Sequence, residues 1–465
     1  MSVEDAAGSM KPEIIKSVQN IIKIKSVKEQ TACGMPFGKG INDALVYALD
    51  TASSLGFRTV NLDGYIGYAE YGQGDEIIGV LGHVDTVAEG KGWMFSPYEG
   101  KIYDNKIYGR GAIDDKGPTV AALYGLKSVK DSGLEIKKKV RIIFGTDEES
   151  GWQDIDYYLK NDIAPVEGFT VDGMFPVINA EKGSIYIELR RDISRKSKGM
   201  ISIKSIIGGN SINSVPDLCT CELRLKDMAK LMLKDTLELY CEKNGINMSM
   251  EEIDDLHVIT SRGISSHSST PWKGKNAISQ FISFISQFNL GQNDVSDFIK
   301  FLASYVCSGS DGADFDIDCG DDILGKLSLS LDCISIDDEK ARAVINIRYP
   351  VTADYEEIMD KIRKIADDKK IDVSVLNHKR ALYVKKESRI VSVLMDSYKS
   401  VTQKDPYTLS INGQTYAKAF DNMVAFGPVF PDKDNCSHMP NECIGIDDLI
   451  ECTKIYARAI YELAK

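Results

Sequence analysis

The chain has 465 residues, which is too long for one hydrophobic core, so two or more domains are expected. Hydrophobic residues make up 43% and charged residues 27%, a balance that excludes a disordered or fibrous protein. The net charge of −13 argues against nucleic acid or an anionic membrane as the main partner, because both select basic surfaces.

The sequence also predicts a cellular compartment. No stretch reaches the run of about 18 apolar residues that crosses a bilayer. The first residues lack the basic and apolar regions of a signal peptide. The ten cysteines are scattered along the chain, which favours free thiols in a reducing compartment. We therefore expect a cytoplasmic protein without a membrane partner.

The first third of the chain alternates between helical and strand patterns. Apolar spacing predicts helices over residues 11–24, 42–55 and 119–129, and continuous apolar runs predict buried strands over residues 77–82 and 139–145. Alternating strands and helices are typical of an α/β sheet with helices on its faces. Such folds bind their ligands just beyond the carboxyl ends of the strands.

The pattern changes near residue 183 and changes back near residue 382. Alternating stretches predict half-buried antiparallel strands over residues 184–189 and 343–348, and helical spacing returns over residues 276–288, 355–366 and 447–463. We therefore predict one α/β domain made of residues 1–182 and 383–465, interrupted by an inserted α+β domain of residues 183–382.

The first candidate for chemistry is the pair His83 and Asp85, which follows the first buried strand. Two residues apart on an extended segment, the side chains point the same way. Asp85 could therefore orient the His83 ring, as carboxylates do for metal-binding histidines. Alone this is weak evidence, because a histidine in such a place more often caps or packs.

Further acidic residues and one more histidine follow strands or precede helices: Asp114-Asp115, Glu148-Glu149, Asp172 and His438. Each has an ordinary alternative, such as an acid at a helix N-terminus or an aspartate in a turn. Together they predict a metal site. Histidine and carboxylate ligands suit zinc, with cobalt or manganese as substitutes, and two ions that share a carboxylate would activate one water for hydrolysis.

Longer motifs carry a family resemblance. The motifs are Gly82-His83-Val84-Asp85-Thr86-Val87, Tyr108 to Pro118, Gly145 to Glu149, Ser265 to Ala277, Asn346 to Pro350 and His438 to Glu442. With these motifs the chain resembles the M20 family of metallopeptidases, and most closely the bacterial dipeptidases of the PepV type, from near residue 11 to the end.

The resemblance implies a zinc-exopeptidase-like catalytic domain, in which a mixed sheet is flanked by helices and the inserted domain acts as a lid. It also implies the ligands of two zinc ions: His83 and Asp172 for one, Glu149 and His438 for the other, and Asp114 as the bridge. Glu148 would be the general base that moves a proton from water to the leaving amine. Asp85 would orient His83.

The inserted domain is expected to contact the substrate. By the resemblance, His267 stabilises the oxyanion of the tetrahedral intermediate. Arg348 clamps the C-terminal carboxylate of the substrate, a task that suits a planar guanidinium. Asn213 is expected to support the same pocket.

The chain departs from the family in one segment. Residues 412–418, Asn-Gly-Gln-Thr-Tyr-Ala-Lys, stand where PepV-like enzymes have a glycine-rich segment that ends in arginine. Glycine allows the backbone to approach a substrate closely, and Gly413 is expected to line the pocket. Asn412 and Gln414 would change the choice of substrate more than the hydrolysis itself.

These features predict a two-zinc hydrolase of unsubstituted dipeptides. The large lid implies a working monomer, because it would supply the oxyanion histidine within one chain. Two alternatives remain open. One is a deacylase of N-acyl amino acids that uses the same metal chemistry, and the other is a degenerate member that binds such ligands without turnover.

Overall fold

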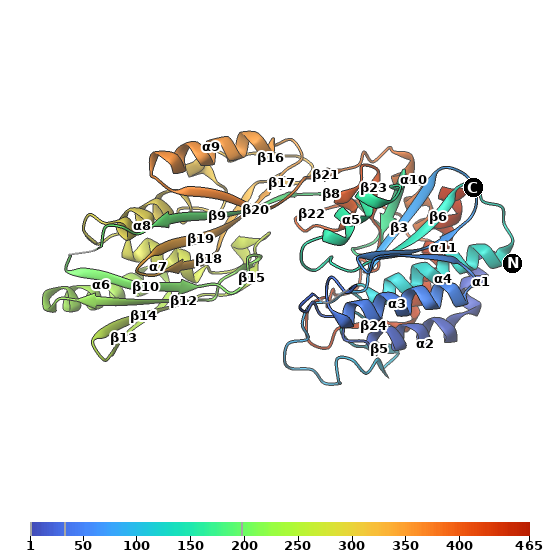
Figure 1. Cartoon of the computed structure of the whole chain (residues 1–465), viewed down its shortest axis with the longest axis horizontal. Helices are drawn as coiled ribbons and strands as arrows, with labels where there is room; N and C mark the ends of the chain where they lie inside the picture. The colour runs from blue at the N-terminus through green and yellow to red at the C-terminus, as the bar shows by residue number, and fades with distance from the viewer. Residues whose placement is uncertain (1, 32–33, 197–198) are drawn as a thin grey trace. The chain divides into compact units, whose positions relative to one another are not determined.

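The protein is described by a computed structural model that covers residues 2–31, 34–196 and 199–465 (Figure 1). It divides into two compact units. The first holds the residues up to Ala180, 383–410 and 414–465, and the second holds 181–382 and 411–413. The sequence predicts the boundaries at 182/183 and 382/383. The return of residues 411–413 to the second unit was not predicted.

The first unit is built on a mixed sheet of nine strands in the order β1-β2-β6-β3-β7-β23-β8-β21, with β22 paired to β8. The central strands β6, β3, β7 and β23 run parallel, and β2 and β8 pair antiparallel with this group. The strands are β1 (Arg58–Leu62), β2 (Ile66–Tyr71), β3 (Ile77–His83), β6 (Lys139–Gly145), β7 (Glu167–Thr170), β8 (Val177–Glu181), β21 (Leu382–Tyr383), β22 (Thr408–Ile411) and β23 (Met423–Ala425). A three-stranded sheet adds β4 (Lys101–Tyr103), β5 (Lys106–Tyr108) and β24 (Cys443–Gly445).

Helices accompany this sheet, which confirms the predicted α/β class. They are α1 (Val3–Ser9), α2 (Lys11–Ile22), α3 (Lys39–Ser54), α4 (Lys116–Ser132), α5 (Gln153–Asn161), α10 (Arg389–Thr402), η3 (Tyr416–Ala419) and α11 (Ile446–Ala464). Helices α4 and α11 pack against each other and against β3 and β6 (Figure 1). The side chains of these two strands are almost all buried. Among the described residues, no helix combines the length and the apolar character needed to cross a membrane.

The second unit contains an antiparallel sheet of eight strands in the order β13-β14-β12-β10-β18-β19-β9-β20. Its strands are β9 (Gly183–Asp192), β10 (Ile201–Gly208), β12 (Leu218–Leu225), β13 (Asn247–Ile253), β14 (Leu256–Arg262), β18 (Ser328–Ile336), β19 (Lys340–Tyr349) and β20 (Asp372–Lys379). The two strands that the sequence predicted, 184–189 and 343–348, lie within β9 and β19.

Short ladders and helices complete the second unit. The ladders join β11 (Ser214–Val215) to β15 (Ser266–His267) and β16 (Gly320–Asp321) to β17 (Gly325–Lys326). The helices are α6 (Asp227–Asn244), α7 (Ala277–Ile285), α8 (Asp294–Tyr305), α9 (Tyr355–Asp368) and the short η1 (Pro271–Lys273) and η2 (Ala313–Phe315). Apolar side chains from the large sheet and from these helices form one buried core.

Candidate metal centre

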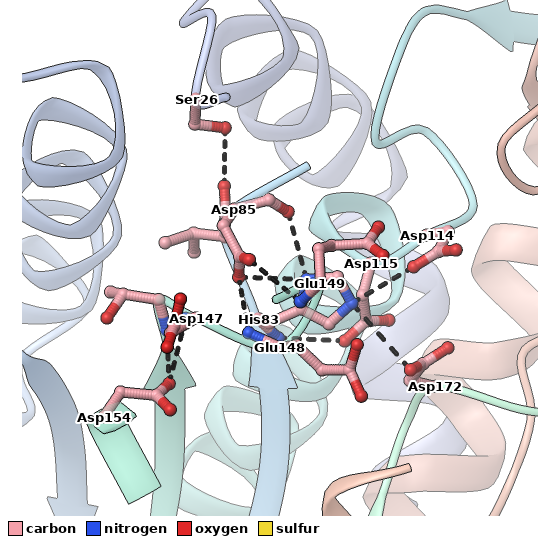
Figure 2. Close-up of polar contacts among 12 residues, drawn as sticks. Ser26, His83, Asp85, Asp114, Asp115, Asp147, Glu148, Glu149, Asp154 and Asp172 are labelled. Atoms are coloured by element: carbon pink, nitrogen blue, oxygen red, sulfur yellow. Dashed lines mark hydrogen bonds and ion pairs between the residues drawn. The ribbon is translucent and has the colours of Figure 1, made fainter. Parts of the chain in front are cut away.

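Three neighbouring parallel strands bring part of the candidate site to one edge of the first sheet. Strand β3 ends at His83 and lies between β6 and β7. Glu148 and Glu149 follow β6, and Asp172 follows β7. Because the carboxyl ends of parallel strands meet at the same edge, these residues arrive close together (Figure 2).

The carboxylate of Asp114 lies between two imidazole rings. Its Oδ1 is 3.1 Å from Nε2 of His83, and its Oδ2 is 3.0 Å from Nε2 of His438. Glu149 Oε1 is 3.1 Å from the same nitrogen of His438, and Asp172 Oδ2 is 3.8 Å from Nε2 of His83. The five residues therefore form two half-sites that share Asp114.

The distances fit a metal site. Nitrogen and oxygen atoms that bind one tetrahedral zinc ion at about 2.0–2.1 Å lie about 3.3 Å from one another. The separations here run from 3.0 to 3.8 Å. Imidazole and carboxylate are also the ligand types that zinc, cobalt and manganese accept. The donor set therefore fits a divalent transition metal.

Asp115, the neighbour of Asp114, has different partners. The two residues are joined by a cis peptide bond. Asp115 Oδ2 accepts hydrogen bonds from the His83 amide at 3.1 Å and from the Thr119 hydroxyl at 3.0 Å. This close packing needs a glycine at position 82, where a Cβ would lie 2.0 Å from the Thr119 hydroxyl oxygen. Asp115 thus holds the end of β3 against α4, whereas Asp114 contacts the rings of His83 and His438.

Asp85 holds both His83 and the loop after β6. The Nδ1 of His83 donates to the backbone carbonyl of Asp85 at 3.0 Å, whereas the expected contact with the Asp85 carboxylate is longer, at 3.4 Å. The two carboxylate oxygens instead accept the backbone N–H groups of Glu148 at 3.3 Å and Glu149 at 3.1 Å (Figure 2). With Nδ1 engaged, Nε2 of His83 faces Asp114.

The electrostatics of the cluster favour a bound cation. Burial, reinforced by neighbouring carboxylates, raises the pKa of Glu148 and of Glu149, and raises the pKa of Asp172 to about 7. Burial alone would also raise the pKa of Asp114, but hydrogen bonds to His438 and His83 lower it well below its usual range. So many acids in one buried place need positive charge to stay ionised at neutral pH.

A buried ion pair joins the two loops that carry Asp114 and His438. Arg110 Nη1 donates to Glu442 Oε2 at 2.6 Å, and both side chains are at most 2% exposed. Glu442 Oε1 accepts the amides of Ile113 at 3.1 Å and Asp114 at 3.2 Å. Arg110 Nη2 donates to the carbonyl of His438 at 3.3 Å. Both residues lie within the matching motifs, but the sequence alone indicates no role for either.

A second buried group supports the loop after β6. Asp154 Oδ2 accepts the amides of Thr146 at 2.7 Å and Asp147 at 3.1 Å, and also the hydroxyl of Tyr416. The Tyr416 ring packs edge-on against His83, with centroids 6.3 Å apart. Tyr416 lies in the segment that departs from the family pattern. Asp154 lies outside every motif, so only its burial and contacts reveal it.

The other predicted site residues lie in the second unit. The backbone of His267 pairs with that of Ser214 in the β11–β15 ladder. His267 Nδ1 accepts the amide N–H of Ser269 at 3.1 Å. A neutral ring therefore carries its proton on Nε2 and can donate a hydrogen bond there. The carbonyl of Asn213 accepts the amide of Ser268 at 3.0 Å, which keeps Asn213 beside this ladder.

Arg348 is buried, with 1% of its surface exposed. Its Nε donates to Asn346 Oδ1 at 3.1 Å and its Nη2 to the Tyr186 hydroxyl at 2.7 Å. In the part of the chain that the structure describes, Nη1 has no hydrogen-bond partner. Burying a guanidinium nitrogen without a hydrogen-bond partner costs free energy, so an anion that accepts a hydrogen bond from Nη1 would be stabilised there.

Gly413 belongs to the short segment that returns to the second unit. A Cβ at this position would meet Ile411 Cδ1 at 3.6 Å, which is an ordinary contact. Local packing therefore does not require glycine here, and its place in a substrate pocket stays a prediction.

An α/β sheet with histidine and carboxylate side chains gathered at its strand ends is the arrangement of a metal-dependent hydrolase. Residues 79–462 match the model of peptidase family M20/M25/M40, and the chain belongs to this metal-dependent family. A protein of Bacillus subtilis (strain 168) with the name "Putative dipeptidase YtjP" is 36% identical over 464 residues, which cover 98% of each chain.

Solved structures share the fold over nearly the whole chain. The di-peptidase Dug1p from Saccharomyces cerevisiae matches with a TM-score of 0.63 at 16% identity, over 99% of this chain and 98% of that one. The M20 family metallo-carboxypeptidase Sso-CP2 from Sulfolobus solfataricus matches with a TM-score of 0.60 at 16% identity, over 97% and 98%. At such identities the likeness concerns the fold alone.

Proposed function

We propose that the protein is a two-zinc dipeptidase that hydrolyses unsubstituted dipeptides. The observation that carries this proposal is the Asp114 carboxylate, which turns one oxygen to His83 and the other to His438. His83 and Asp172 would hold one ion, Glu149 and His438 the other, and Asp114 would bridge them. When bound, the ions supply positive charge that activates water and polarises the scissile carbonyl.

Glu148 is proposed as the general base. Its carboxylate forms a group with His83 and Asp172 in which the potential ligand atoms lie within 4.8 Å of one another. It would take a proton from the attacking water and deliver it to the amine that leaves when the C–N bond breaks. A carboxylate whose pKa is raised by burial suits this transfer, because it is a stronger proton acceptor than an exposed one. Asp85 would support the step by holding the Glu148 amide.

Substrate recognition is assigned to the second unit. The Nε2–H of His267 would donate to the carbonyl oxygen that becomes negative in the transition state. Nη1 of Arg348 would pair with the C-terminal carboxylate of the dipeptide, and Asn213 and Gly413 would line the pocket. The dipeptidase name of the Bacillus subtilis relative supports this choice of substrate. We also expect the enzyme to work as a monomer in the cytoplasm.

The substrate is tested with purified protein on matched compounds. We expect hydrolysis of dipeptides and little hydrolysis of N-acetyl amino acids or tripeptides. Activity on N-acetyl amino acids alone would instead show a deacylase, and a protein that binds these compounds without turnover would be a degenerate member.

Metal removal tests the metal centre. We expect a chelator to abolish hydrolysis and added zinc to restore it, with cobalt or manganese as weaker substitutes. Elemental analysis of the purified protein should find two ions per chain. One ion per chain in a fully active enzyme would contradict the proposed bridge at Asp114.

A further inference from the structure

The second unit contains a buried acid that the proposed reaction does not use. Asp332 lies in β18, where the register with β19 shifts between Leu331 and Cys333. Such a bulge re-aims a side chain within a sheet. The side chain of Asp332 is fully buried. A buried carboxylate persists only where other groups compensate for its lost hydration, so its partners indicate its purpose.

One partner of Asp332 leads to His267. Asp332 Oδ2 accepts the hydroxyl of Ser268 at 2.7 Å, and Ser268 is covalently next to His267. The amide of Ser268 donates to the carbonyl of Asn213 at 3.0 Å. Ser268 is thus held by its side chain and by its backbone, and this fixes the backbone position from which the His267 ring projects.

Asp332 Oδ1 also accepts the hydroxyl of Ser330 at 2.5 Å, and a third contact connects Asp332 to Arg348. Asn346 lies close enough to Asp332 to lower the pKa of that carboxyl group. Its Nδ2 donates to the Ile212 carbonyl at 3.2 Å, and its Oδ1 accepts Nε of Arg348 at 3.1 Å.

Asn346 and Ser268 are both fully buried. A buried chain of polar contacts therefore runs from Ser268 through Asp332 and Asn346 to Arg348. Burial raises the pKa of Asp332 to about 7, and the Arg348 guanidinium partly offsets this rise.

We propose that Asp332 is a positioning residue that holds the oxyanion donor His267 and the carboxylate clamp Arg348 in one fixed relation. This inference rests on the proposed function, which gives those two residues their roles. In a dipeptide, one residue separates the scissile carbonyl from the C-terminal carboxylate. A fixed relation between donor and clamp therefore selects substrates in which both groups are correctly spaced.

The test compares each dipeptide with the same dipeptide carrying a C-terminal amide, which lacks the charge that Arg348 would bind. We expect Asp332→Asn to lower kcat/KM for dipeptides by about 10- to 100-fold, because small misplacements of substrate-binding groups have effects of this size. We also expect Asp332→Asn to reduce the preference for the dipeptide over its amide. The reduced preference should approach the preference shown by Arg348→Met.

The matched control is Asp294→Asn. Asp294 is a buried acid of the same unit, 3% exposed, and its partners are Arg191 and Arg195 in a separate network. Asp294→Asn should lower the melting temperature but keep the wild-type preference for the dipeptide. Equal loss of preference in both variants would show a merely structural effect and overturn the proposal.

Two further variants, each of which changes only one neighbour of Asp332, test the proposal even if Asp332→Asn does not fold. Ser268→Ala should lower kcat and leave the preference for the dipeptide unchanged, whereas Asn346→Ala should reduce that preference. If neither variant shows its expected effect, Asp332 does not couple His267 to Arg348. A wild-type protein that does not hydrolyse dipeptides would instead reject the proposed function itself, and this inference with it.

Discussion

Glu148 and Glu149 are adjacent in the sequence but have different surroundings. Glu149 Oε1 contacts His438, whereas the Glu148 carboxylate lies in the group with His83 and Asp172. This difference follows from Asp85, which accepts both amides and so fixes how the two side chains diverge. The geometry alone would also admit Glu148 as a metal ligand, and a mutation can separate the two roles.

We expect Glu148→Gln to lower kcat by a factor of about 10² to 10⁴, the usual contribution of a general base, while the zinc content stays at the wild-type value. Glu149→Gln is the comparison, because loss of a ligand should lower the zinc content as well. Steady-state kinetics and elemental analysis on both variants make the distinction. If Glu148→Gln loses as much zinc as Glu149→Gln, Glu148 is a ligand.

The buried carboxyl group of Asp154 should make the free energy of unfolding depend on pH. Burial, partly offset by hydrogen bonds from Tyr416 and the Thr146 amide, raises its pKa to about 7. Between about pH 4 and pH 7 the folded state therefore binds more protons here than the unfolded state, and this group makes folding less favourable as the pH rises. Asp154→Asn removes the ionisation, so its stability relative to wild type should improve from pH 5 to pH 7.5.

Urea unfolding at several pH values, at constant zinc concentration, measures this difference. Tyr416→Phe is the control, because it removes the hydroxyl partner but keeps the titrating carboxylate. Its stability should still fall with rising pH, at least as steeply as that of wild type, because the lost hydrogen bond lowered the pKa of Asp154. A difference between Asp154→Asn and wild type that does not vary with pH would refute the assignment.

At the scale of elements, the site depends on two loops that are far apart in the chain. The loop before α4 carries Asp114, and the loop before β24 carries His438. Strand β24 pairs with β5, and the buried pair of Arg110 and Glu442 binds the backbone of both loops. A change in this pair should therefore alter both half-sites together.

Glu442→Gln should leave Arg110 buried without a charged partner, which costs about 3–5 kcal/mol of stability. We also expect zinc affinity to fall about 10- to 100-fold, as for other groups that support metal ligands. Chelator competition and thermal unfolding measure the two effects. Glu4→Gln is the control, since its ion pair with Arg458 is partly exposed and such pairs contribute about 0–1 kcal/mol. Unchanged zinc affinity in Glu442→Gln would rule out the supporting role.

Elements with strong local patterns could be predicted, and short ones could not. The strands at residues 77–82 and 139–145 show continuous apolar runs, and the helix at 447–463 shows an apolar period. The structure has β3, β6 and α11 there. Strands β5 and β24 have three residues each, and their pairing joins Tyr108 to Cys443. A local apolar pattern cannot predict the pairing of two residues that lie so far apart in the sequence.

At the scale of the whole molecule, the chain forms two compact units that carry different sets of proposed site residues. The proposed metal ligands all belong to the first unit, and His267, Arg348 and Asn213 to the second. A ligand that binds one folded unit stabilises that unit by mass action, by about 2.7 kcal/mol at a concentration one hundred times its dissociation constant. The second unit should not respond.

We therefore expect two thermal transitions in the metal-free protein, of which only one moves to higher temperature when zinc is added. Differential scanning calorimetry after chelation and after zinc addition checks this. Histidine-to-alanine variants identify the transitions, because His438→Ala should abolish the shift and His257→Ala should not. A single transition that moves as a whole would show that the units unfold together.

The sequence by itself determined the α/β class, the family resemblance and the candidate ligands, because these depend on local apolar periods and on residue types in a fixed order. Only the tertiary structure decided that the two oxygens of Asp114 face different histidines. It alone also revealed the buried groups around Arg110, Asp154 and Asp332. The physical reason is that a charged side chain can be buried only with partners, and the fold brings those partners from distant parts of the chain.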